Sequence, residues 1–261
     1  MIWLASFPRS GNTFMRNVLF QVYGLESSAI HEKNLEQPGD RLTFPIVKTH
    51  LMPHQVAHLG AKPAVIYLVR DGRDALVSLA HHRSNIVAPG SDFHFNLSEA
   101  LKAKEGSFFG GWHQNVLDWI QKADVIVRFE DLIQDPMAQM ERIESVLSLP
   151  ARVERIELPT FDTQKFGNPR YGPNGEKKTL FFRKGKIGDW KEEMPQRLQK
   201  AFWYKSGPLM ELLGYTPTGE IEALPPLDRI NGAAQMLGPA PEAWYEKGIV
   251  GKMMDHWPRK K

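Results

Sequence analysis

Cysteine is absent from the 261-residue chain, which excludes disulfide bonds and zinc sites built on thiolates. No apolar run approaches the length that spans a membrane, and no basic-then-apolar signal peptide precedes the first apolar segment. An excess of one charge is also missing, because 33 basic and 30 acidic residues give a net charge of only +3. A general nucleic-acid-binding protein is therefore not expected, although a pI near 9 suits an anionic ligand. We expect a cytoplasmic protein without integral membrane association.

The composition is sufficient for one large α/β core, since 42% of the residues are hydrophobic. Near-continuous apolar runs alternate with helix-like segments, a pattern typical of parallel strands covered on both faces. The expected strands are 2–5, 45–50, 64–70 and 125–129, and the expected helices are 13–23, 74–83, 109–122, 136–147 and 196–213. This alternation predicts a three-layer, open, mostly parallel sheet with the ligand at the carboxyl ends of its strands.

The segments without periodicity complete the expected organisation. Residues 86–105 and 161–187 are predicted to be long irregular loops, which in a compact domain are usually functional. We assign residues 1–214 to one domain. The proline-rich extension 215–261 is expected to pack on the same domain or to be partly disordered.

The most informative motif, Phe-Pro-Arg-Ser-Gly-Asn-Thr-Phe at 7–14, follows the first strand directly. A strand, a tight glycine turn and a helix N-terminus direct backbone N–H groups and a positive dipole end to one point. Arg9 and the hydroxyls of Ser10 and Thr13 add charge-assisted donors. A Walker A loop would continue with Gly-Lys-Ser/Thr, which is missing here. The motif therefore predicts a phosphate-binding loop without the lysine of ATPases.

Lys48 and His50 are two residues apart at the end of the second expected strand, so both side chains should point the same way. A cation beside a neutral imidazole suits group transfer, because the lysine neutralises charge and the histidine removes a proton from the acceptor. Taken alone, such a pair is more often ordinary polarity at a strand end.

Two further basic segments could hold a second phosphate. Arg70 ends the third expected strand, and Ser78 lies in the first turns of the next helix. The alternative for Arg70 is an ion pair with Asp71 or Asp74. Residues 182–191 contain two glycines and four cations, which indicates either a loop that closes on a polyanion or a solvated charged loop.

In this order, the motifs resemble the PAPS-dependent sulfotransferase family, whose members move a sulfuryl group from 3′-phosphoadenosine 5′-phosphosulfate (PAPS) to an acceptor. The resemblance runs from Ser6 to about Leu213 and implies a P-loop-kinase-like architecture. The segments that carry it are 7–14, 46–51, 67–71 with Ser78, 129–132 and 183–191, of which the last is the most specific. We expect a cytosolic-type, bacterial-type member.

The resemblance implies which residues bind PAPS. The 5′-phosphosulfate would be held by Arg9, Ser10, Gly11, Asn12 and Thr13. The 3′-phosphate would be held by Arg70, Ser78, Arg183, Lys184 and Gly185. Phe14 and Phe161 would stack on the adenine.

The catalytic residues implied by the resemblance are His50 as general base, Lys48 as the cation that stabilises the transferring group, and Arg9. Transfer from a phosphosulfate is an in-line displacement in which positioning and charge neutralisation do most of the work. Lysine and arginine supply that charge, so no metal is expected. The pairs His54/His58 and His81/His82 are interpreted as surface histidines without a third ligand. The alternative for the second pair is that one of its histidines lines the acceptor pocket.

The chain also departs from the family pattern. Arg9 replaces a frequent lysine, Phe14 a tryptophan and Phe129 a tyrosine. Pro195-Gln196 and Lys200 replace residues of the dimerisation signature, so that mode of dimer is not expected and the oligomeric state stays open.

Two other functions remain possible from the sequence. A P-loop nucleotide kinase or NTPase could use 69–71 and 128–131 as Walker B-like strand ends, but the missing Gly-Lys-Ser/Thr argues against it. A non-catalytic binding module on the same sheet would tolerate the loss of Lys48 or His50.

The acceptor, a small molecule or glycan with a hydroxyl or amine, is expected against His50 between the loops 86–105 and 161–180. Aromatic residues of these loops would suit an apolar alcohol, and basic ones a sugar or acidic acceptor. The two sets are Phe93, Phe95, Phe108, Phe166 and Tyr171, and Lys102, Lys104, Lys165 and Arg170.

Overall fold

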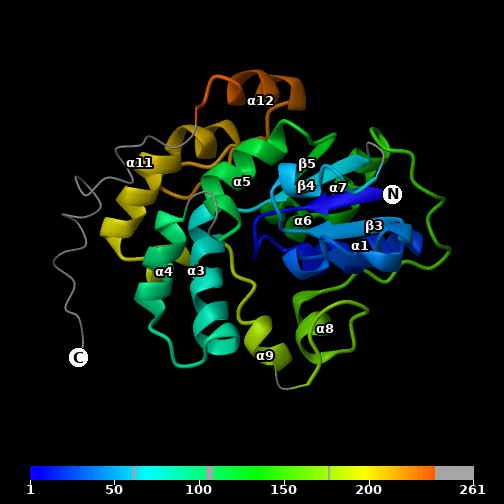
Figure 1. The fold of residues 1–261 in the computed structure, drawn as a ribbon, viewed down its shortest axis with the longest axis horizontal. Helices are drawn as coiled ribbons and strands as arrows, with labels where there is room; N and C mark the ends of the chain where they lie inside the picture. Colours follow the sequence, from blue (N-terminus) through cyan, green and yellow to red (C-terminus); the bar gives the residue numbers. More distant parts are fainter. Residues whose placement is uncertain (61–62, 104–107, 176, 239–261) are drawn as a thin grey trace.

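The computed structural model describes residues 1–60, 63–103, 108–175 and 177–238. Its centre is a five-stranded sheet in the order β2-β3-β1-β4-β5 (Figure 1). The strands are β1 (Ile2–Ala5), β2 (Ser27–Ile30), β3 (Ile46–Thr49), β4 (Ala64–Val69) and β5 (Val125–Arg128). All four neighbouring pairs are parallel. The predicted α/β class, with its open sheet and P-loop-kinase-like architecture, is confirmed.

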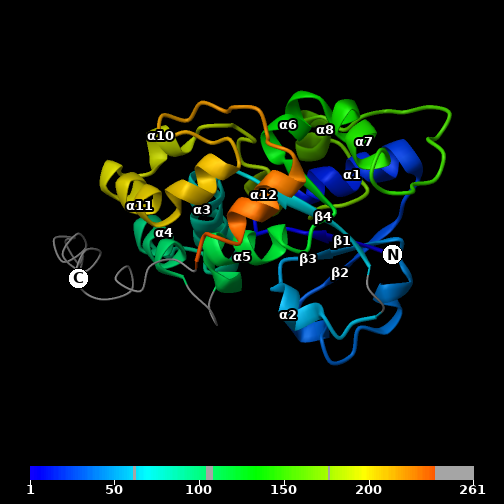
Figure 2. The ribbon, with the colours of Figure 1, turned by 90° about the horizontal axis from the view of Figure 1, so that it is seen from above.

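Alternation of side chains along the strands divides the core into two layers of helices. Leu4 of β1 and its neighbours pack under α1 (Asn12–Tyr23) and α7 (Pro136–Glu144). Trp3 and its neighbours pack on the other face, under α3 (Gly72–His82), α5 (Gly111–Ile120) and α11 (Gln196–Leu212). In Figure 2, α1 and α7 lie on one side of β1 and β3, and α2 lies on the other.

The remaining helices have ten residues or fewer. They are α2 (Pro53–Val56), α4 (Phe93–Lys102), α6 (Phe129–Gln134), α8 (Phe161–Phe166), α9 (Lys177–Phe181), α10 (Trp190–Glu193) and α12 (Leu227–Ala234). Single 3₁₀ turns occur at 32–34, 39–43 and 108–110, and a π-helical turn at 83–87. None of the helices in the described ranges has the length and apolar character needed to cross a membrane.

The prediction of irregular structure in 86–105 and 161–187 was wrong in part, because α4, α8 and α9 lie there. Helix α4 begins where the Asp92 carboxylate accepts a hydrogen bond from the Phe95 N–H, and it buries Leu97 and Leu101 against α3. The spacing of these two leucines was a usable helix signal. Strand β2 was also missed, because its residues Ser27 and Ser28 do not form an apolar run.

The segment after Gly214 packs on the same core as far as it is described. Tyr215 is buried and forms a β-bridge with Ile221. Helix α12 contacts α5 and α11 through Ile230 and Ala234, which belong to the large core cluster. Residues 239–261 lie outside the described residues, and the boundary at residue 214 stays a prediction.

Candidate active site

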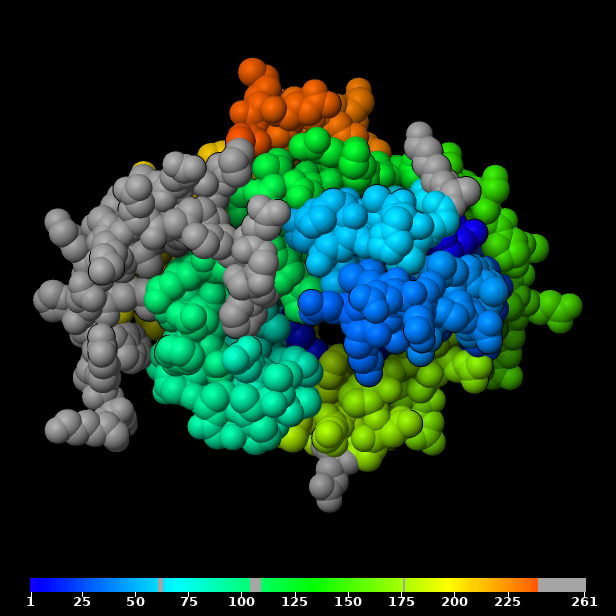
Figure 3. Space-filling model, viewed as in Figure 1, coloured from blue at the N-terminus to red at the C-terminus, as the bar shows by residue number. Residues whose placement is uncertain are grey.

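A cavity of about 830 Å³ opens at the carboxyl edge of the sheet. In Figure 3 the surface is hollowed where the blue N-terminal segments meet the yellow-green segments around α8 and α9. The cavity is lined by thirteen of the predicted site residues, namely Arg9, Gly11, Asn12, Thr13, Phe14, Lys48, His50, Arg70, Ser78, Phe161, Arg183, Lys184 and Gly185. The other one, Ser10, is fully buried. The fold thus gathers residues from five separate segments, while their individual roles stay predictions.

The loop between β1 and α1 is shaped by two residues with positive φ, Arg9 at 68° and Gly11 at 94°. Helix α1 follows with no side-chain cap and no acidic residue in its first turn. Its N-terminal N–H groups and dipole are therefore available to an anion. The buried Ser10 hydroxyl and the Arg70 Nε atom have no hydrogen-bond partner among the described residues. A phosphate group would supply the acceptor that each lacks, so the loop fits such a ligand.

Arg9 lies across the cavity floor. Its Nε atom donates to the Ser78 hydroxyl at 3.1 Å, and its terminal nitrogen donates to the Phe181 carbonyl at 2.7 Å. Burial, followed by the charges of Arg70 and Arg183, lowers the pKa of Arg9 to about 10. Three guanidinium groups thus repel one another, and an anion between them would relieve the repulsion.

Arg70 is held rigidly at the end of β4. Its guanidinium donates to the Arg9 carbonyl at 3.2 Å and to the Lys186 carbonyl at 2.9 Å, and lies 3.7 Å from the Asp74 carboxylate. It also stacks 4.6 Å from the ring centre of Phe129. The sequence left an ion pair and a ligand-facing role as alternatives, and the structure combines the Asp74 contact with a place in the cavity wall.

Asp74 anchors the basic loop, a role that the sequence analysis did not predict. Its buried carboxylate accepts hydrogen bonds from the N–H groups of Gly188 at 2.7 Å and Trp190 at 2.9 Å. These bonds fix the glycine-containing basic loop to α3. No local sequence signal reports a contact between residues more than 110 positions apart.

The basic loop carries its own counter-charges. Arg183 and Lys184 both pair with Asp189 and with Glu193, and the Lys184–Asp189 distance is 2.9 Å. His81 also pairs with Glu193, while His82 lines the cavity. A phosphate bound here must compete with two carboxylates for the same cations.

His50 lies just beyond β3, with its ring fixed by the first strand. Its Nδ1 atom is 2.8 Å from the Ser6 carbonyl oxygen, so Nδ1–H donates there and Nε2 keeps its lone pair. Burial and the nearby charge of Lys48 hold the pKa of His50 well below its usual value. A neutral imidazole is thus ready to accept a proton at neutral pH.

Asn115 of α5 positions this part of the cavity. Its amide donates to the His50 carbonyl at 3.3 Å and to the Phe109 carbonyl at 3.1 Å, and accepts from the Tyr67 hydroxyl at 3.0 Å. Phe109 adopts φ = 58°, and its ring contacts the His50 ring edge-on. Neither Asn115 nor Phe109 was predicted as a site residue.

Lys48 enters the cavity from β3. Among the described residues, its ammonium group has no hydrogen-bond or ion-pair partner. Burial, then the charges of Arg16 and Arg9, lower the pKa of Lys48 to about 7. The group is held without a counter-ion next to His50, and an incoming anion would raise this pKa again.

The two loops predicted to face the acceptor contribute Val87, Phe161 and Gln164 to the cavity wall, but most of the aromatic and basic residues named for that role do not line it. Phe93, Phe95, Phe166 and Tyr171 are not among the residues that line the cavity, nor are Lys102, Lys165 and Arg170. Phe95 and Phe166 are exposed on the outer surface, whereas Tyr171 is buried with its hydroxyl bound to the Ser27 N–H. Lys104 and the side chain of Phe108 lie outside the described residues. The aromatic residues that do line the cavity are Phe14, Phe109, Phe129, Phe161, Phe181 and Phe182.

The structure places the histidines considered for metal binding in different surroundings. His54 is exposed on α2, and His81 is engaged by Glu193. Over the described ranges, no group of three or more His, Cys, Asp or Glu side chains is arranged to hold a metal ion.

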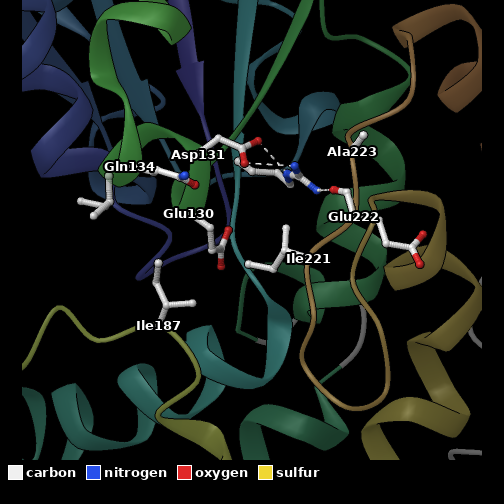
Figure 4. A pocket seen from close by; sticks show the side chains of 9 residues that line it. Glu130, Asp131, Gln134, Ile187, Ile221, Glu222 and Ala223 are labelled. Atoms are coloured by element: carbon white, nitrogen blue, oxygen red, sulfur yellow. Dashed lines mark hydrogen bonds and ion pairs between the residues drawn. The ribbon is translucent and has the colours of Figure 1, made fainter.

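A smaller cavity of about 450 Å³ lies behind the basic loop, and Figure 4 shows Glu130 there with Ile187 and Ile221 on either side. The buried Glu130 carboxylate accepts from the Asp71 N–H at 3.0 Å and from the Tyr215 hydroxyl at 2.8 Å. Burial raises the pKa of Glu130 to about 7. This carboxyl group therefore couples stability to pH.

We expect the free energy of unfolding to fall as the pH rises through the interval between about 4.3, the unfolded pKa, and about 7, the folded pKa. In this window the folded state keeps a proton that the unfolded state has released, which corresponds to about 4 kcal/mol of additional stability below the window. Glu130→Gln should remove this slope, because an amide can accept from Asp71 and donate to Tyr215. Urea unfolding at pH 5, 6, 7 and 8 would measure how the free energy of unfolding depends on pH. Glu222→Gln, which changes an exposed side chain, is the control. Equal slopes in the wild type and Glu130→Gln would contradict the prediction.

The model of the sulfotransferase domain family matches residues 26–213, which is more than two thirds of the chain. The protein belongs to the sulfotransferase family. The match begins after the phosphate-binding loop, so the assignment of residues 9–14 depends on the loop geometry and its sequence motif.

Individual sulfotransferases agree with this membership. Cytosolic sulfotransferase 1 of Danio rerio is 27% identical over 242 residues, which cover 77% of this chain and 79% of the relative. The crystal structure of mouse sulfotransferase SULT7A1 complexed with PAP superposes with a TM-score of 0.59 at 21% identity, over 77% of this chain and 80% of that one. Retinol dehydratase in complex with androsterone and inactive cofactor PAP gives a TM-score of 0.54 at 20% identity, over 77% and 78% of the two chains. At these identities, the solved structures show that the fold is shared.

Proposed function

We propose that this sulfotransferase moves the sulfuryl group of PAPS to a hydroxyl or amine of a small-molecule or glycan acceptor. The observation that carries the proposal is the meeting in one cavity of the phosphate-binding loop, of neutral His50, and of Lys48, which has no ion-pair partner among the described residues. Mouse SULT7A1 and retinol dehydratase, which share the fold, are both described in complex with PAP.

The strand order supports a direction for the bound nucleotide. Elements proposed for the 3′-phosphate, Arg70 and α3, follow β4, while the proposed 5′-phosphosulfate loop follows the adjacent β1. Lys48 belongs to β3 and His50 directly follows this strand, on the other side of β1. A ligand lying across these carboxyl ends would have its sulfuryl group near β3.

PAPS would supply an activated sulfuryl group with a good leaving group. The cations Arg9 and Lys48 would offset the negative charge that shifts to the leaving oxygen. His50 Nε2 would take the proton from the acceptor, while the Ser6 carbonyl holds Nδ1–H and stabilises the imidazolium that results. We propose that no metal is needed.

The kinase or NTPase alternative receives no support from the carboxylates that it would require. Asp131 is bound by Arg128 through two hydrogen bonds, and Asp71 by Arg73 in the same way. Asp131 and Glu130 line the smaller cavity, and neither is among the residues that line the large one. A magnesium ion at the phosphates of a bound nucleotide would have no partner among these three side chains.

A thermal-shift panel of 3′,5′-ADP, ADP, ATP and AMP tests the proposal directly. We expect 3′,5′-ADP to raise the melting temperature well above the effect of ADP, in EDTA as well as in buffer. The reason is that the 3′-phosphate gains charge-assisted hydrogen bonds to Arg70, Arg183 and Lys184. Equal stabilisation by ADP and 3′,5′-ADP would refute the PAPS assignment, and Mg²⁺-dependent stabilisation by ATP would favour the kinase.

We further propose a cytoplasmic location, by analogy with the relatives named cytosolic sulfotransferases. We also keep the division at residue 214 as a proposal. The dimerisation signature is not matched, so no dimer is proposed.

A further inference from the structure

The cavity extends past the transfer centre to the edge of the sheet. Ile30 of β2 is paired with Thr49 of β3, so His31 follows β2 beside the segment that carries His50. His31 and Arg16 line the same cavity as Lys48. Because β2 lies on the far side of β3 from β1 and β4, His31 is one strand farther from the proposed nucleotide site than Lys48. Arg16 belongs to α1 and contacts β2 through Ser27.

Arg16 is fixed in this wall by a set of contacts. Its Nε atom donates to the Ser27 hydroxyl at 2.7 Å, and one terminal nitrogen donates to the Ser27 carbonyl at 3.1 Å. The guanidinium stacks 4.0 Å from the ring centre of Tyr171, whose hydroxyl accepts from the Ser27 N–H at 2.8 Å. The other terminal nitrogen, Nη1, has no hydrogen-bond partner among the described residues. A rigid guanidinium therefore presents a free donor edge at the cavity.

Among the described residues, the carboxylates that line the cavity are those of Asp74 and Asp189, and both are already engaged by other groups. Asp74 is occupied by the Gly188 and Trp190 N–H groups, and Asp189 by Arg183 and Lys184. Arg16 is also the largest source of charge repulsion on Lys48. An anion beside Arg16 would offset this repulsion and would accept the free N–H donors.

We propose that the acceptor carries an oxyanion, a carboxylate, phosphate or sulfate, that binds between Arg16 and His31 while its hydroxyl or amine faces His50. The proposal rests on the proposed function, because it defines the acceptor of that same site. The proposal predicts an anionic acceptor, such as an acidic sugar or a phosphorylated alcohol, and not a neutral one. The competing explanation is that Arg16 only joins α1 to β2.

The test uses the full chain saturated with 3′,5′-ADP and three matched pairs of probes: glucuronate and glucose, glycerol 3-phosphate and glycerol, and 4-hydroxybenzoate and 4-hydroxybenzamide. At constant ionic strength, we expect at least one anionic member to raise the melting temperature further, and its neutral partner to have no effect. Arg16→Gln should lower the affinity for that anion about 10- to 100-fold, since a hydrogen bond between charged groups is lost. Arg155→Gln, on the exposed surface away from the cavity lining, is the matched control and should bind as the wild type does.

Four results would overturn the inference: no stabilisation by any anionic probe, equal stabilisation within each pair, no effect of Arg16→Gln, or loss of anion binding in Lys48→Met alone. The last result would mean that the anion occupies the sulfuryl position. Circular dichroism of Arg16→Gln checks that the fold is retained, and unchanged affinity for 3′,5′-ADP checks the nucleotide site. If the protein prefers 3′,5′-ADP to ADP but no anionic probe stabilises it, the proposed function remains intact and only this inference is refuted. Loss of that preference would remove the proposed function itself.

Discussion

Replacing His50 with alanine is expected to lower the rate of sulfuryl transfer by a factor of about 10² to 10⁴ and to leave the affinity for 3′,5′-ADP unchanged. The imidazole lies beyond β3, whereas the proposed 3′-phosphate ligands Arg70 and Ser78 follow β4, on the other side of β1. Its removal takes away the proton acceptor without changing the charge of the cavity, since the low pKa of His50 keeps it neutral. Release of 3′,5′-ADP from PAPS with a competent acceptor, together with a 3′,5′-ADP titration, would measure both quantities.

The control for this prediction is His54→Ala, which removes an exposed imidazole from α2, four residues away. It should retain wild-type activity and stability. His50→Ala with more than a tenth of the wild-type rate would show that another group or water accepts the proton. Equal losses of rate and of 3′,5′-ADP affinity would instead indicate that the cavity has collapsed around the missing ring.

Much of the sheet could be predicted because a strand that is covered on both faces has a continuous apolar sequence. β1, β3, β4 and β5 were found in this way, and their carboxyl ends located the predicted site. β2 lies at the edge of the sheet and pairs only with β3, so Ser27 and Ser28 can be polar without cost to the core. The sequence pattern therefore missed the strand next to which Arg16 and His31 lie.

Site residues were predictable where a motif contains them and unpredictable where distant segments meet. The phosphate-binding loop is continuous, so its residues could be named before the structure was known. Asp74, Asn115 and Arg16 act through contacts with Gly188, the His50 carbonyl and Ser27, which only the tertiary fold brings close. The acceptor wall was mispredicted for the same reason. Loop aromatics such as Phe95 and Phe166 turn outward, whereas Phe109, held by an Asn115 hydrogen bond, turns toward His50.

Gly11→Ala is expected to weaken 3′,5′-ADP binding by about 100-fold, because two separate effects meet at this position. The first is backbone strain, since φ = 94° is a conformation that alanine adopts at a cost of about 1–2 kcal/mol. The second is steric, because a Cβ atom would lie 2.2 Å from the ring of Phe129. That ring is buried and stacks on Arg70, so it cannot move without displacing a proposed 3′-phosphate ligand.

The two effects can be separated with variants of this chain. Gly90 has a similar φ of 85° but open space around its Cα, so Gly90→Ala reports the strain alone and should bind 3′,5′-ADP normally. Gly11→Ala combined with Phe129→Leu relieves the overlap and should recover part of the affinity, because leucine leaves room where the ring stood. Calorimetric titration of 3′,5′-ADP into the four proteins measures this. Wild-type affinity in Gly11→Ala would contradict the assigned loop, and no recovery in the double variant would assign the loss to the backbone, whose N–H groups must then make the decisive phosphate contacts.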